Sequence, residues 1–378
     1  MSARRVTTNF PRLVEAYLRT GDLAKRDAIG IALQQKYGRQ GRLSTSTVQS
    51  EMETVFGVRG QPIKTETLNK SPEDILMELE SNIVADLGVY SLVIAGPPLE
   101  FTKAVRIGPV RFVLPDELST CAAFDDEEDE TEVRKWYASS TASCFAEISV
   151  SGDGWTAIRE AQAILREVWT TFYFCLHKYS GGRKWVGGSV SAWYRRDDGT
   201  QGSFGSGRRE VRFDAFAPED VERMRRRGFS HIEGVLSKDV DDRSDLESRL
   251  LKASAWWVIS DVENHPGIAV VSSVTAMESV LLPDRPSEAS RTLCQRVACI
   301  TRNTPGDRAD AFKRCRDVVN ARHTVVHAGH REVEDGILGQ AKELAFEVLS
   351  AAWDIVISGK FNSGEELATH LDAEIFKS

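Results

Sequence analysis

The chain has 378 residues, of which 41% are hydrophobic and 28% are charged, a composition typical of folded globular proteins and not of disordered or fibrous ones. We find no apolar run of the length that a membrane-spanning helix needs and no apolar stretch after the first residues, so neither a membrane span nor a secretory signal is expected. The net charge of −8 argues against a general nucleic-acid coat protein, although one local basic cleft remains compatible with it. The six cysteines are scattered without a C-x-x-C pair, which favours free thiols and a cytoplasmic location.

The first part of the chain begins with helical patterns. Residues 10–37 have helical spacing with a break near Gly21, and residues 44–47 indicate a loop or the cap of a short helix. Ser71 and Pro72 are typical N-cap and N1 residues. We expect the helix that they start to carry an apolar stripe made of Ile75, Leu76, Leu79, Ile83 and Val84.

From Tyr90 onward the pattern changes to strands. Strands are predicted over residues 90–95, 104–114, 144–150, 185–194 and 205–213, and a strong helix follows the turn at residues 152–154. The acidic run at residues 125–130 is interpreted as a solvated loop, with a metal or basic-partner site as the lesser alternative. Gly187 and Gly188 lie inside a strand pattern without the phosphate-loop motif, which favours a bulge.

A short helix is predicted from Pro218, and an arginine cluster lies at its end: Arg223, Arg225, Arg226 and Arg227. These cations either complement the helix C-terminus or contact RNA phosphates. Residues 237–243 then have the composition of a linker. Helices are predicted beyond it over residues 244–262, 266–282, 287–301 and 333–357, with one more helix before the last. We therefore expect an α+β sensor or regulatory domain over residues 1–236 and an all-α bundle over residues 240–378.

The helix before the last carries the Arg322–His327 segment, Arg-His-Thr-Val-Val-His, followed by Ala328 and Gly329. His323 and His327 share a helix face with Arg322 adjacent to it, while Val325 and Val326 are expected to point into the core. Gly329 is a candidate cap that leaves His330 beyond the last turn. An arginine holds phosphate and a histidine transfers protons near neutral pH, the groups that cleave a phosphodiester without metal. The spacing alone also suits a cap or a surface pair.

Two stretches together resemble a known family. Met277–Leu282 and Arg316–Gly329, separated by a loop and a helix, look like a HEPN domain, most nearly the Apea-like HEPN group of bacterial proteins. That group has a glutamate-bearing helix end, an arginine-polar-x-x-x-histidine signature followed by glycine, and a long closing helix. The resemblance covers residues 245–357. It implies an all-helical, metal-independent ribonuclease in which two copies pack to form one composite cleft.

The resemblance also implies a role for each matching residue. Arg322 would bind the scissile phosphate, His327 would act as general acid or base, and His323 would orient the phosphate or the ribose. Glu278 matches an acidic residue that could hold Arg322 in place. A plain buried salt bridge between Glu278 and Arg322 is an equally good interpretation. Attack by the 2′-hydroxyl makes RNA, possibly tRNA, the expected substrate. Neither a cofactor nor a metal ion is expected.

Two alternatives stay open at this point. A HEPN module without activity would bind RNA, a nucleotide or a protein partner. His323, His327 and His330 could instead chelate zinc, although the neighbouring Arg322 disfavours a cation. Apea-like HEPN proteins are associated with defence of bacteria against phage, in which RNA cleavage halts the infected cell. By that analogy the N-terminal region would receive an unknown trigger or inhibitor, and the bundle would form a homodimer.

Overall fold

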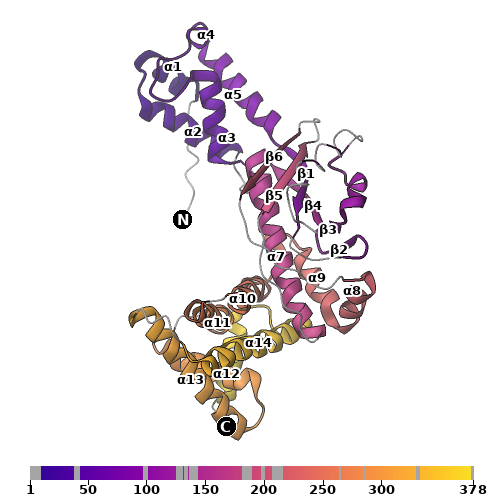
Figure 1. The fold of residues 1–378 in the computed structure, drawn as a ribbon. Coiled ribbons are helices and arrows are strands. Elements are labelled where there is room, and N and C mark those ends of the chain that lie inside the picture. The colour runs from indigo at the N-terminus through magenta and orange to yellow at the C-terminus, as the bar shows by residue number, and fades with distance from the viewer. Residues whose placement is uncertain are drawn as a thin grey trace.

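The computed structural model describes residues 10–37, 43–96, 101–124, 131, 135, 144–180, 190–196, 201–206, 216–263, 265–283, 286–328 and 333–375, with the backbone alone for 190–196 and 201–206. Figure 1 shows three regions in chain order: a group of N-terminal helices, a β-sheet lined by a long helix, and a C-terminal group of helices. Several predicted features lie outside the described residues: the helix stop at 38–41, the acidic run at 125–130, and the glycines at 187 and 188.

The N-terminal helices form a unit with its own hydrophobic core, to which Tyr17, Leu33, Phe56 and Leu79 belong. Their bounds are α1 Phe10–Thr20, α2 Leu23–Tyr37, α3 Thr45–Phe56, α4 Thr65–Leu68 and α5 Pro72–Asp86. The predicted caps are confirmed, because the Ser44 and Ser71 side chains accept hydrogen bonds from the first turns of α3 and α5. The apolar stripe of α5 is narrower than predicted, since Val84 is 53% exposed.

The sheet is antiparallel, with strand order β2-β3-β4-β1-β5-β6. The strands are β1 Gly88–Ala95, β2 Val105–Ile107, β3 Val110–Val113, β4 Phe145–Gly152, β5 Val190–Arg196 and β6 Gln201–Ser206. The single strand expected over 104–114 is a hairpin. Gly108, at φ 55, turns the chain where an L-residue with a side chain would be strained.

The helix α7, Gly154–Ser180, lies against the sheet and extends to the C-terminal helices (Figure 1). Its start is fixed by Asp153, which is fully buried and accepts the Thr156 amide hydrogen at 2.8 Å. The backbone N–H of Ser44 donates to the same carboxylate and so ties the N-terminal unit to α7. One hydrophobic core continues from Leu92 in the sheet, through α7, to Trp353 in the last long helix. The domain division between residues 236 and 240 stays a prediction.

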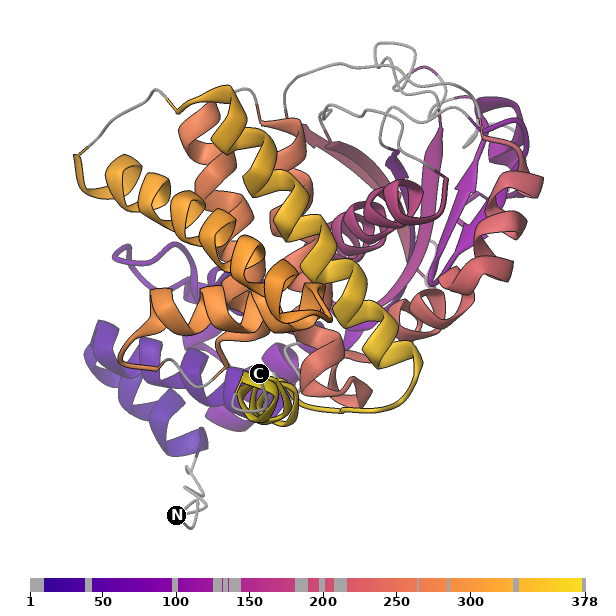
Figure 2. The same cartoon turned by 90° about the horizontal axis from the view of Figure 1, so that it is seen from below.

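The C-terminal region is helical throughout the residues that the structure describes (Figure 2). After α8 Pro218–Met224 and α9 Ser230–Leu236 come α10 Asp245–Val262, α11 Pro266–Leu281, α12 Ala289–Thr301, α13 Pro305–Ala328, α14 Asp335–Ile357 and α15 Gly364–Ile375. α11 packs on α10, α13 and α14, which agrees with its nearly continuous apolar pattern. The helix α15 was not predicted, because its buried stripe is short: Leu367, Ala368 and Leu371.

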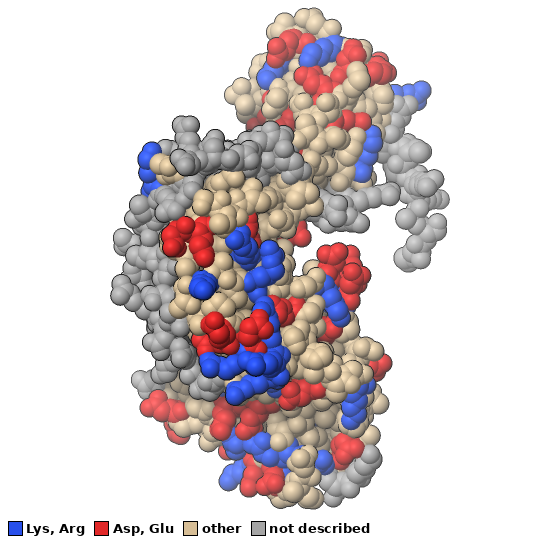
Figure 3. All heavy atoms as spheres, turned by 90° about the vertical axis from the view of Figure 1, so that its right-hand side faces the viewer, with Lys and Arg blue, Asp and Glu red and all other residues tan. Residues whose placement is uncertain are grey.

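The predicted order, an α+β region followed by a helical region, is thus confirmed at the level of secondary structure. Among the described helices, none has the length and apolar character needed to cross a bilayer. On the face that carries β2, β3, α8 and α9, basic and acidic side chains lie side by side instead of separating into one basic surface (Figure 3).

Candidate active site

The Arg322–His327 segment forms the last turns of α13, which is described as far as Ala328. Earlier in the helix, Cys315, Val318 and Val319 are buried, whereas Arg316 and Asn320 are exposed. With 3.6 residues per turn, His323 and His327 continue the exposed side, and Arg322 continues the buried side. The predicted cap Gly329 and His330 lie outside the described residues.

The two histidines lie close together, as their spacing predicts. The ring centroids of His323 and His327 are 5.8 Å apart and the ring planes are inclined by only 15°. His323 is half-buried and its Nε2 lies 3.1 Å from the Ser290 hydroxyl on α12, whereas His327 is exposed. His323 is therefore held in position by a neighbouring helix, and His327 is free to contact a molecule arriving from solvent.

The Arg322 guanidinium lies next to Glu278 on α11. The Arg322 Nη2 and Glu278 Oε2 atoms are 3.9 Å apart, and the two side chains are 27% and 34% exposed. That separation is an ion pair without a direct hydrogen bond. The Arg322 Nε is buried and has no hydrogen-bond partner in the structure. Because both side chains reach solvent, a fully buried salt bridge does not describe the pair, and Arg322 keeps donors for a ligand.

The two valines of the segment differ from each other. Val325 packs against the start of α11, where a Cβ added to Gly267 would lie only 3.0 Å from its Cγ1, so that the expected inward direction holds for this residue. For Val326 the expectation is wrong, since it is 50% exposed. Val326 lies on the same side of α13 as Val319. Val319 is buried, whereas Val326 is in the last turn of the helix and is exposed there.

Two further polar residues near the segment were not found from the sequence. Ser290 touches His323, as described above. His265 caps α11, accepting the Ile268 amide hydrogen at its Nδ1 (3.4 Å), and its ring lies beside Gly267, the glycine that Val325 also approaches. The sequence offers only a weak signal for either: a serine in the first turn of a helix, and a histidine before the N1 residue Pro266.

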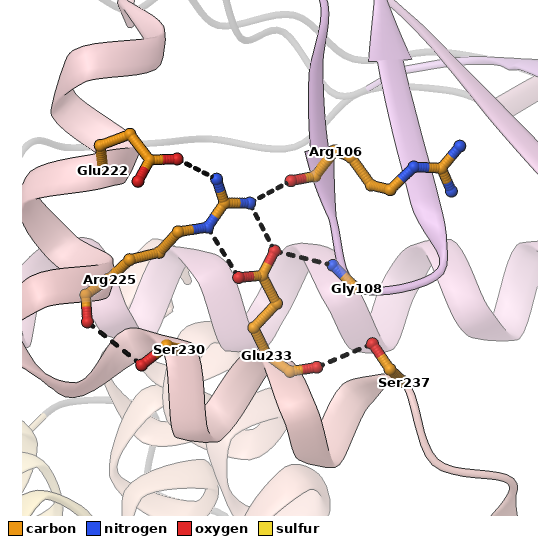
Figure 4. A network of polar contacts seen from close by, with 7 residues as sticks. All are labelled: Arg106, Gly108, Glu222, Arg225, Ser230, Glu233 and Ser237. Atoms are coloured by element: carbon orange, nitrogen blue, oxygen red, sulfur yellow. Dashed lines mark hydrogen bonds and ion pairs between the residues drawn. The ribbon is translucent and has the colours of Figure 1, made fainter.

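The other arginine-bearing segment, at the end of α8, is engaged within the protein (Figure 4). Arg225 donates to the Glu233 carboxylate from Nε at 2.8 Å and from Nη2 at 2.6 Å, and also to Glu222 and to the Arg106 carbonyl oxygen. These hydrogen bonds raise the pKa of Arg225 above its already high value. Arg223 pairs with Asp220, and Arg227 donates to the Tyr179 carbonyl oxygen. These contacts favour a structural role for the arginines at the end of α8 over a role in binding RNA phosphates.

In the described part of the chain, no group of three or more His, Cys, Asp or Glu side chains is arranged to hold a metal ion. Comparison of the chain with protein-family profiles, with curated proteins and with solved structures found no match. The HEPN likeness therefore rests on the residues of Met277–Leu282 and Arg316–Gly329 alone.

Proposed function

We propose that this chain is a metal-independent endoribonuclease whose reacting groups lie at the end of α13. The observation that carries the proposal is how the arginine and the two histidines lie in the last turns of α13. Arg322 is positioned by Glu278 without being saturated with hydrogen bonds, and His327 is exposed beside the positioned His323. A guanidinium with unused donors binds a phosphate bidentately, and an exposed imidazole transfers protons near neutral pH.

The chemistry is an intramolecular transesterification. The ribose O2′ loses its proton to a base and forms a bond to phosphorus, while the bond from phosphorus to the O5′ atom of the next nucleotide breaks. The O5′ atom takes a proton from an acid, and a 2′,3′-cyclic phosphate remains. His327 serves this proton transfer, and Arg322 stabilises the charge that develops on the phosphate oxygens. His323, held by Ser290, orients the phosphate or the ribose, and Glu278 orients Arg322.

The helix geometry supports a site made by two copies of the chain. Arg322 and His327 are five residues apart, so their side chains leave the helix axis about 140° apart in direction. The reaction also needs one base and one acid at the same time. Two copies packed at the ends of α13 supply two arginines and two His327 imidazoles, which satisfies both requirements. The proposed partner is therefore a second copy of this chain.

The α+β region serves, in this proposal, as the restraint on the nuclease. An RNase that is always active harms its own cell, which agrees with the resemblance to proteins of antiphage defence and with a toxin-like role. The α7 helix links the two regions, since Lys178 near its end donates to the Ser350 carbonyl oxygen at 2.8 Å and pairs with Asp354 of α14 at 2.9 Å. Expression of the wild type should then be toxic to bacteria when phage is present, and expression of an Arg322→Ala variant should not.

The direct test incubates purified protein with total RNA and with tRNA in EDTA. The wild type should cleave, and the Arg322→Ala/His327→Ala variant should not. Arg314→Ala/His231→Ala is the matched control, because Arg314 pairs with Glu343 away from the segment and His231 is exposed on α9. This control should cleave like the wild type. Retained RNA binding without cleavage by the wild type would instead identify a binding module, and cleavage that requires a divalent ion would contradict the proposal.

A further inference from the structure

A cleft of about 230 Å³ lies between α2 and α3 in the N-terminal unit. Its apolar wall includes Val48 and Met52. Its polar and charged lining consists of Arg26, Asp27, Gln34, Thr45, Gln49 and Arg59. Nothing in the proposed nuclease reaction uses this cleft, which belongs to a different hydrophobic core from that of α13.

Arg26 is the unusual group of the cleft. The residue is only 3% exposed, and its Nη2 is buried without a hydrogen-bond partner. An arginine cannot shed its charge to relieve burial, so a buried guanidinium nitrogen without a hydrogen-bond partner is unfavourable. Arg296, which is 2% exposed, shows the usual solution: it donates to both Asp372 oxygens, at 2.9 and 2.8 Å, and to the Leu281 carbonyl oxygen at 2.7 Å.

The one carboxylate among the residues that line the cleft is hydrogen-bonded to a different arginine. Asp27 accepts from Arg59, with 3.2 Å between Nε and Oδ1 and 2.7 Å between Nη2 and Oδ2. The hydrogen bonds from Arg59 lower the pKa of Asp27, so this carboxyl stays ionised. Two guanidinium groups and one carboxylate give the lining of the cleft a formal excess of one positive charge.

We propose that this cleft binds a small molecule that carries an oxyanion, a phosphate or a carboxylate, with Arg26 as its anchor. The fixed fork of the guanidinium matches either anion bidentately. Thr45 and Gln49 line the cleft as further hydrogen-bonding groups, and Val48 and Met52 offer an apolar wall to the neutral part of the ligand. The volume suits a small metabolite-sized ligand and not a polymer. The proposal does not depend on the nuclease activity.

The experiment titrates the full-length chain with sodium phosphate and, separately, with sodium acetate, against sodium chloride at matched ionic strength. Thermal unfolding and calorimetry are the readouts, because a ligand of the folded state raises the unfolding midpoint by mass action. The variants are Arg26→Met and the matched control Arg19→Met, which removes an exposed arginine of α1. A stronger response to phosphate identifies a phosphoryl ligand, and a stronger response to acetate identifies a carboxylate.

The wild type and Arg19→Met should bind one of these anions beyond the chloride baseline. Arg26→Met should bind it at least about tenfold more weakly, the loss expected for one charge-assisted hydrogen bond. Without anion, Arg26→Met should unfold at the same temperature as the wild type or a higher one, because it removes a buried charged group whose Nη2 has no hydrogen-bond partner. An equal anion response in Arg26→Met, no response of the wild type, or failure of Arg26→Met to fold would each overturn the proposal.

Discussion

The arginine cluster of α8 and the end of α13 look alike in the sequence, since both place arginines at the end of a helix where a phosphate could bind. The structure separates them by what each arginine already contacts. Arg225 has two carboxylates and a carbonyl oxygen within hydrogen-bonding distance, whereas Arg322 has one carboxylate at 3.9 Å and a buried Nε without a partner. An arginine whose donors are used by hydrogen bonds within the protein stabilises the fold, whereas an arginine with unused donors can bind a ligand.

The largest effect should come from the reacting groups on α13. Replacing Arg322 or His327 singly with alanine should lower the RNA cleavage rate on the order of 100-fold or more. The free energy of unfolding should change by less than about 1 kcal/mol for His327, because the side chain is exposed. Single-turnover cleavage and urea unfolding of the same preparations measure both quantities. A parallel loss of stability and activity would mean that the α13 residues are structural.

Arg225→Met should give the opposite result. Removing the cation leaves Glu233, whose side chain is 16% exposed, without its main partner, at a cost of about 2–4 kcal/mol in the free energy of unfolding. Cleavage per folded molecule should stay at the wild-type rate. Arg226→Met is the matched control, since Arg226 is exposed, and should change stability by no more than about 0.5 kcal/mol. If Arg225→Met had the same free energy of unfolding as the wild type, the proposed difference between the arginines of α8 and the end of α13 would be wrong.

Glu278→Gln tests whether the acidic residue positions Arg322. We expect roughly a tenfold loss of cleavage rate, since the neutral amide keeps the shape but loses the attraction that directs the guanidinium. In the Arg322→Ala background the same change should have almost no further effect, which a double-mutant cycle reveals. Independent, additive losses would show that Glu278 acts on something other than Arg322.

The smallest effect should follow Ser290→Ala. Its hydroxyl lies 3.1 Å from the Nε2 of His323 and the contact is exposed, so its loss should slow cleavage by about two- to fivefold. Thr324→Ala on the same helix is the control, because its hydroxyl donates to the Asn320 carbonyl oxygen of its own helix. If the threonine variant slowed cleavage as much as the serine variant, His323 would not owe its position to Ser290.

Much of the fold and part of the candidate site could be predicted from patterns among neighbouring residues. Caps such as Ser44 and Ser71, the 3.6-residue spacing of α7 and α11, and the shared face of His323 and His327 are all properties of neighbouring residues. The features that could not be predicted from the sequence depend on packing between distant segments of the chain. Examples are the exposure of Val326, the contact of Ser290 with His323, and the burial of the Arg26 Nη2 without a hydrogen-bond partner.

The most direct test of the account is the chemistry at the cleaved bond. The cleavage site of the wild type in EDTA would be mapped on a tRNA, and the assay repeated on the same RNA with a 2′-O-methyl group at that one nucleotide. We predict a 2′,3′-cyclic phosphate end on the first RNA and no cleavage at that position in the second, because the nucleophile is blocked. Cleavage at the methylated nucleotide, or a 5′-phosphate end, would contradict the proposed mechanism.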